Sequence, residues 1–192
     1  IRIGFHYGIT DKLTLGVSRC KRHENLEGLV KYKILEQTAS NSIPVGVTVF
    51  GNATYSTIDK SLVEKSIYRN TYLSQLIVTH KFSPKFSMAA VGSYLHRNLV
   101  DPDDKNDVIA VSGGLRMKIT PSTAIILDYS HAFGREHLTT KYYDPIGAGI
   151  ESETGGHVFS IMFTNASGIL ENDSLVNTVD SWDKGRFKFS FI

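Results

Sequence analysis

The stretch Ile9–Thr14 (ITDKLT) joins two runs of alternating apolar and polar residues, and it recurs in similar form as Phe82–Ser87 (FSPKFS) and Ile119–Ala124 (ITPSTA). Each copy has the residue types of a tight hairpin turn. The connections between these hairpins are longer and more polar. Short turns that alternate with long loops are typical of transmembrane β-barrels, so the pattern predicts a location as well as a fold.

The 192 residues predict a single domain that spans 1–192. Hydrophobic residues make up 41% and charged residues 21%, and no apolar run reaches the length of about 18 residues that a membrane-spanning helix needs. This excludes a helical membrane protein. It does not exclude a barrel, because barrel strands alternate apolar and polar residues.

About eleven strand-like runs are bounded by Gly, Pro, Asn, Asp or Ser clusters. We expect them near 1–9, 12–20, 28–36, 44–57, 70–82, 86–99, 107–119, 123–133, 148–154, 157–166 and 185–192. Within 70–82 both faces mix polar and apolar residues, and within 123–133 the segment Ala124–Leu127 (AIIL) is apolar on both faces. Both patterns suit a wall packed against a plug as well as a buried sandwich strand.

If the short turns are periplasmic, the segment 167–184 is an extracellular loop and the first run begins at the extracellular rim. Bacterial barrels have even strand numbers and periplasmic termini. We therefore expect an all-β, antiparallel up-and-down barrel of about twelve strands, with the first strand missing from this sequence.

Several segments resemble an uncharacterised family of outer-membrane β-barrels from Bacteroidota-type bacteria. They are Ile1–Gly4 (IRIG), Tyr7–Thr14 (YGITDKLT), His96–Val100 (HRNLV), Glu153–Phe159 (ETGGHVF) and Phe163–Asn165 (FTN). The resemblance implies a bacterial outer-membrane location and an additional N-terminal strand. It implies no activity, cofactor or catalytic residue.

The period of two places most basic strand residues on the face opposite the aliphatic residues, which is the lumen of a barrel. These basic candidates are Arg2, Lys31, Lys33, Arg116, Lys118, Arg186 and Lys188, against the acidic candidates Asp128, Glu151 and Glu153. A basic excess favours anions if a continuous water path exists. The alternative is a closed barrel in which these charges pair internally.

Other chemistry finds little support in the sequence. The acidic loop with Asp101, Asp103, Asp104 and Asp107 is a weak cation site without the central Gly and terminal Glu of a calcium loop. The single Cys20 is expected to be a small wall residue. No His-x-Ser pair of a lipase-like barrel occurs, and a net charge of +2 without a basic block excludes nucleic acid as an expected partner.

The sequence therefore predicts an integral outer-membrane β-barrel without catalytic machinery or cofactor, either a structural or accessory component or a narrow pore for small anionic solutes. Its expected partners are outer-membrane lipid and membrane proteins that dock on the extracellular loops. Aromatic residues near the run ends favour this prediction, because an aromatic girdle belongs there: Phe5, Tyr7, Tyr55, Phe82, Phe86, Phe133, Phe187 and Phe191. The alternatives are a soluble β-sandwich or lipocalin-like binding module and an outer-membrane hydrolase.

Overall fold

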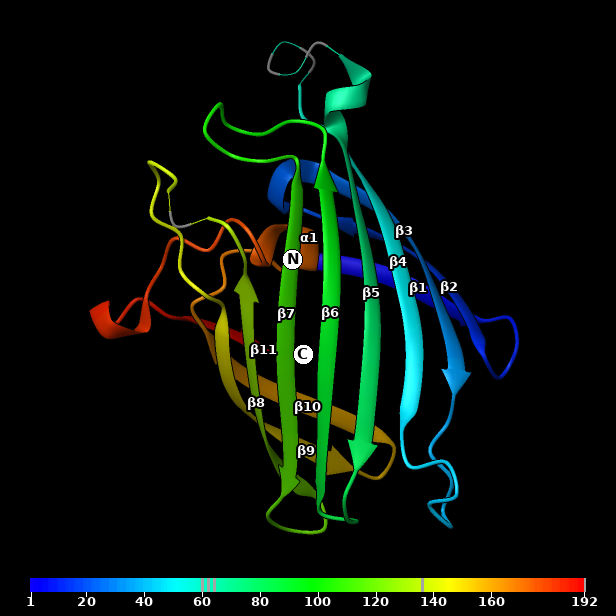
Figure 1. The fold of residues 1–192 in the computed structure, drawn as a ribbon. Helices are drawn as coiled ribbons and strands as arrows, with labels where there is room; N and C mark the ends of the chain where they lie inside the picture. Colours follow the sequence, from blue (N-terminus) through cyan, green and yellow to red (C-terminus); the bar gives the residue numbers. More distant parts are fainter. Residues whose placement is uncertain (60, 62, 64, 136, 192) are drawn as a thin grey trace.

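The computed structural model describes residues 1–59, 61, 63, 65–135 and 137–191 as one strongly curved antiparallel sheet (Figure 1). Each strand pairs with its sequence neighbour, so the sheet order is the chain order. The strands are β1 Arg2–Gly8, β2 Leu13–Cys20, β3 Asn25–Leu35, β4 Gly46–Ser56, β5 Asn70–Lys81, β6 Phe86–Arg97, β7 Asp107–Lys118, β8 Thr123–Ala132, β9 Ile146–Thr154, β10 His157–Thr164 and β11 Lys188–Phe191.

Helical structure is confined to the connections. Three short 3₁₀ segments, η1 Arg22–Glu24, η2 Ser66–Arg69 and η3 Trp182–Lys184, and one α-helical turn, α1 Glu171–Ser174, lie outside the strands. Among the described residues, no helix has the length and hydrophobicity to cross a membrane.

The three similar turns share one hydrogen-bonding scheme. The hydroxyl of Thr10 accepts the backbone N–H of Leu13 at 3.0 Å, and that of Ser83 accepts the N–H of Phe86 at 3.1 Å. In the third turn the hydroxyl of Thr120 accepts the backbone N–H of Thr123 at 2.9 Å. A hydroxyl that caps its own turn in this way explains why Ser or Thr occupies the same place in all three copies.

The sheet has two ends of different character. The connections 9–12, 36–45, 82–85, 119–122 and 155–156 lie at one end, which we call the turn end, and the links 21–24, 57–69, 98–106, 133–145 and 165–187 lie at the other, the loop end. Apart from the long connection 36–45 at the turn end and the short link 21–24 at the loop end, this alternation confirms the predicted arrangement of short turns and long loops.

The sheet does not close on itself in the described residues, because β1 and β11 each have one neighbour only. Both strands run from the loop end to the turn end, as their odd numbers in an antiparallel meander require. The expected strand β11 begins at Lys188, three residues later than the predicted run at 185.

Large apolar side chains cover the outer face of the sheet. Val17, Leu76, Val111 and Ile150 are between 45% and 61% exposed in the middle of their strands. A water-soluble protein buries such residues. Exposed aromatic residues flank this apolar band, at the loop end Tyr55, Tyr72, Tyr94, Tyr129 and Phe163, and at the turn end Tyr7, Tyr32, Phe82, Phe159 and Phe191. Phe5, expected at a strand end, instead lies in the middle of β1, opposite Val17.

Candidate functional site

Among the described residues, the segment 165–187, which connects β10 to β11, is the most buried connection. Leu170, Val176 and Thr178 are each 1% exposed, and Leu175 is 7% exposed. Figure 1 shows α1, in orange, inside the curve of the sheet near the loop end. The first half of the expected loop 167–184 is therefore buried, because its apolar side chains pack against the inner face of the sheet. We call residues 170–178 the plug.

Apolar packing holds the plug against the wall. Leu175 and Val176 form one core cluster with inward-facing residues of neighbouring strands, among them Leu73, Leu95 and Val108. Burial of one such side chain is worth about 1.5–3 kcal/mol. These inward apolar residues explain why the alternation in 70–82 is mixed: the inner face there packs against the plug rather than water.

A chain of buried polar groups continues from the plug into the wall. The side-chain N–H₂ of Asn52 donates to Oδ1 of Asn172 at 2.8 Å and to Oε1 of Glu27 at 2.7 Å. Glu27, 3% exposed, also accepts the hydroxyl of Ser18 and pairs with Arg2, each at 2.5 Å. One hydrogen-bonded chain thus joins the plug to β1, β2, β3 and β4.

Asp173 connects the other side of α1 to the β2–β3 link. Its carboxylate lies 2.5 Å from Nε of Arg22 and 3.6 Å from Nε2 of His23, and it accepts the amide of Asn177 at 2.6 Å. Burial opposes ionisation, but the hydrogen bonds from His23 and Asn177 and the charge of Arg22 together lower the pKa of Asp173. The plug therefore carries an ionised carboxylate that the β2–β3 link neutralises.

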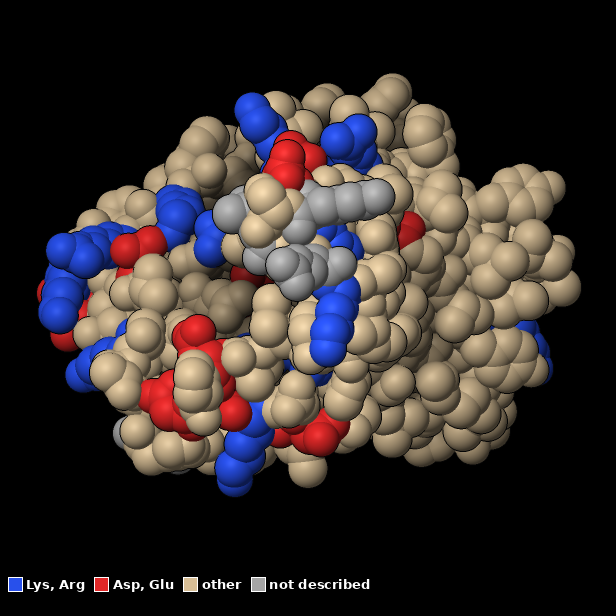
Figure 2. Space-filling view, turned by 90° about the horizontal axis from the view of Figure 1, so that it is seen from above, with Lys and Arg blue, Asp and Glu red and all other residues tan. Residues whose placement is uncertain are grey.

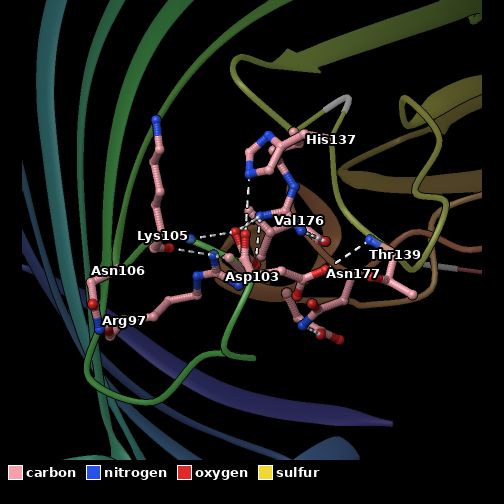
Figure 3. A network of polar contacts seen from close by, with 11 residues as sticks. Arg97, Asp103, Lys105, Asn106, His137, Thr139, Val176 and Asn177 are labelled. Carbon is pink, nitrogen blue, oxygen red and sulfur yellow. Dashed lines mark hydrogen bonds and ion pairs between the residues drawn. The ribbon is translucent and has the colours of Figure 1, made fainter.

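Asp104 connects two wall links to the plug. Its carboxylate accepts a hydrogen bond from Arg97 at 2.8 Å and two from Arg135 at 2.9 and 3.0 Å. Arg135 also donates to the backbone carbonyl of Val176 at 2.8 Å. Burial opposes ionisation, yet the hydrogen bond from Arg97 and the two positive charges lower the pKa of Asp104. Figure 3 shows Arg97 reaching from the wall towards Val176 and the loop around Asp103.

The basic residues predicted to line the lumen are mostly paired. Arg2 pairs with Glu27, Lys33 with Glu36 at 2.9 Å, Arg116 with Glu151 at 2.8 Å, Lys118 with Glu153 at 3.5 Å, and Lys188 with Asp180. Lys31 and Arg186 enter no ion pair within the part of the chain that the structure describes. The predicted basic excess is thus largely offset by neighbouring carboxylates.

The acidic loop does not gather its carboxylates around one point. Asp103 accepts the backbone N–H of Thr139 at 2.8 Å, while Asp104 binds the two arginines. Asp107 accepts the hydroxyl of Tyr94 at 2.6 Å, and Asp101 is exposed. Over the described residues, no group of three or more His, Cys, Asp and Glu side chains has the arrangement of a metal site.

The residues that organise the loop end were missed by sequence reasoning, namely Glu27, Asn52, Arg135 and Asp173. Their partners are distant in the sequence; 120 residues separate Asn52 from Asn172. The only local signal is Glu27-Gly28-Leu29, where an acidic and an apolar residue share the inward face of β3. Cys20 is buried at the end of β2, the position expected of a small wall residue.

The family described as "Membrane bound beta barrel domain (DUF5777)" matches residues 1–192. No curated protein matches the chain.

Proposed function

The chain belongs to the membrane bound beta barrel domain family (DUF5777), and from this premise we propose that it is an integral wall protein of a bacterial outer membrane. Its lumen is closed at the loop end by its own plug, residues 170–178. Its role is structural or accessory, with no catalytic step and no cofactor.

The apolar outer belt is the observation on which this proposal rests. Mid-strand residues such as Val17 (61% exposed) and Ile150 (54% exposed) face outward between two aromatic levels. In β6, eight residues separate Phe86 at the turn end from Tyr94 at the loop end, about 27 Å along a strand. With the usual strand tilt of about 35–45° this corresponds to about 19–22 Å along the barrel axis, close to the apolar band of about 25 Å found in outer-membrane barrels.

The direction of the edge strands supports a twelve-stranded wall. Because β1 and β11 run the same way, a wall that stays antiparallel throughout needs an odd number of further strands between them. One additional strand gives twelve and removes both free edges. We propose that the turn end faces the periplasm, that lipid surrounds the belt, and that protein partners dock on the loop end.

Internal charge pairing favours a closed wall protein over an anion pore. Selectivity requires free charge along a water path. The lumen cations Arg116 and Lys118 each face a carboxylate, Glu151 and Glu153, and the plug fills the loop half. We therefore propose that the resting protein does not conduct.

Three measurements test the proposal. Cell fractionation and heat-modifiable gel migration should place the protein in the outer-membrane fraction as a folded barrel; recovery as a detergent-independent soluble monomer would support the lipocalin-like alternative. In planar bilayers the purified protein should give no steady unitary current. A steady current with anion-selective reversal potential would replace the closed wall by the pore.

A further inference from the structure

The inner face of the sheet carries a row of polar side chains where four neighbouring strands reach the loop end. The row consists of Asn25 of β3, Thr54 and Ser56 of β4, Thr71 of β5 and Arg97 of β6, and each of them lies opposite another member in the strand register. The next inward residues of β5 and β6 are Leu73 and Leu95, which are each 1% exposed in the apolar cluster that holds the plug. The polar row therefore lies on the loop-end side of an apolar layer.

A cavity of about 460 Å³ lies between this polar row and the plug. The plug contributes Asn172, Asp173 and Asn177 to its lining, and the links 57–69 and 98–106 contribute others. Figure 2, which looks onto the loop end, shows acidic and basic side chains gathered around a hollow. The volume is in the range that holds a small organic molecule. Because the cavity lies on the inner side of the sheet, away from the apolar outer belt, a ligand reaches it from the water at the loop end.

Charge matching leaves the lining without a preference for an ion of either sign. The two buried carboxylates have guanidinium partners, which are Arg97 and Arg135 for Asp104 and Arg22 for Asp173. The third carboxylate, that of Asp101, is exposed to water. Arg69, 6% exposed, donates through both terminal nitrogens to four backbone carbonyls, so its fork is already occupied by oxygen atoms.

Hydrogen-bond donors and acceptors lie side by side on the lining. Nε of Arg97 and Nδ2 of Asn172 are buried donors without an acceptor in the described part of the chain, and Asn172 is 5% exposed. Asn177 donates its N–H₂ group to Asp173 at 2.6 Å, which leaves its carbonyl oxygen as an acceptor. The hydroxyl of Ser56 donates to a backbone carbonyl at 2.7 Å and likewise keeps its lone pairs. A ligand group that both donates and accepts suits such a lining, and a hydroxyl does both.

We propose that this cavity binds a neutral sugar that is free in solution and has the size of a mono- or disaccharide. The sugar hydroxyls accept from Arg97 and Asn172. They donate to Asn177 and Ser56. The ring of Tyr142, which also lines the cavity, supplies apolar surface for the C–H groups of the sugar. The site is independent of the proposed wall function: an outer-membrane wall protein that binds no sugar would refute the site alone.

Thr71 and Thr79 provide a matched pair of test variants. Both side chains lie on the inner face of β5, but Thr71 lines the cavity, whereas Thr79 lies near the turn end of the strand. Thr71→Tyr places a bulky side chain in the proposed site, and Thr79→Tyr makes the same change outside it. Heat-modifiable gel migration checks that both variants fold.

The full chain is purified in a detergent without a sugar headgroup, because a maltoside or glucoside would compete for the site. Calorimetric titrations use glucose, galactose, mannose, xylose, maltose and lactose, with glucuronate and glucosamine as the charged counterparts of glucose. At least one neutral sugar should bind the wild type and Thr79→Tyr saturably, with a Kd below about 1 mM, and Thr71→Tyr should bind it at least about tenfold more weakly.

Two kinds of result would overturn the proposal. Absence of saturable binding by every neutral sugar, or equal binding by the two tyrosine variants, refutes the site. If glucuronate or glucosamine binds about tenfold more tightly than every neutral sugar, the ligand is an ion and the neutral class is wrong.

A milder pair of variants covers the case in which Thr71→Tyr does not fold. Thr71→Leu removes the hydroxyl and extends an apolar side chain into the cavity, so it should weaken binding of the same sugar by at least about fivefold. Thr79→Leu makes the same change near the turn end and should leave the affinity within about twofold of the wild type. If the two leucine variants bind equally tightly, the proposed site is wrong.

Discussion

The two ends of this barrel are built by different means. At the turn end, one hydroxyl within each short connection caps the backbone, as Thr10, Ser83 and Thr120 do. At the loop end, contacts between distant segments hold the plug, such as that of Arg135 with Asp104 and Val176. The turn end therefore depends on local sequence, and the loop end depends on residues that meet only in the folded wall.

A charge inside the plug should have the largest effect. Val176 is 1% exposed and packs in the apolar cluster of the loop half, so Val176→Asp buries a carboxylate without a partner. We expect a loss of about 3–5 kcal/mol in unfolding free energy or release of the plug with appearance of bilayer current. Val179→Asp makes the same change on the same segment at 45% exposure and should cost below about 0.5 kcal/mol. Equal behaviour of the two variants in urea unfolding and in bilayers would contradict a packed plug.

Loss of the shared carboxylate should come next. Asp104→Asn leaves Arg97 and Arg135 without their common counter-charge, and both arginine side chains are largely buried. We expect a loss of about 3 kcal/mol in urea unfolding from lipid vesicles. Asp11→Asn, in the first short turn, removes a carboxylate at the opposite end and should change stability by less than about 0.5 kcal/mol. If both variants lose the same stability, the difference between the two ends is not electrostatic.

Acid should weaken the loop end specifically. The folded-state pKa values of Asp104 and Asp173 lie below the ordinary value of 3.8. A depressed pKa contributes stability that is complete above 3.8 and is lost as the pH falls from there through the folded pKa. The urea midpoint should thus fall as the pH drops below 3.8, and Asp104→Asn should show a shallower fall than the wild type or Asp11→Asn. If the wild type and Asp104→Asn lose stability equally with falling pH, the pKa of Asp104 is the same in the folded and the unfolded protein.

The period-two pattern was sufficient to predict the wall. Ile109 and Val111 alternate with Ala110 and Ser112 across the two faces of β7 as expected, and the strands follow one another in a simple meander. This succeeds because each residue's face depends only on its neighbours in the strand and on a turn of a few residues.

The plug could not be predicted in the same way. Nothing in the spacing of 167–184 indicates that Leu175 and Val176 are buried, because the surface that covers them comes from β5, β6 and β7. Leu73 and Leu95 are apolar residues on the inner face, where polar residues were expected. They indicate only that some apolar group packs against the inner face of the sheet. Which segment packs there, and which arginines bind it, depends on the curvature of the whole sheet.

The smallest expected effect concerns a single turn. Thr120→Val removes the hydroxyl that accepts the N–H of Thr123 at 2.9 Å while keeping the branched shape of the side chain. We expect a loss of about 1 kcal/mol, because this bond is exposed and water replaces part of it. Thr120→Ser keeps the hydroxyl, as Ser83 does in the homologous turn, and should retain most of the wild-type stability. If Val and Ser variants unfold at the same urea concentration, the repeated hydroxyl does not stabilise the turn, and the likeness of the three connections needs another physical cause.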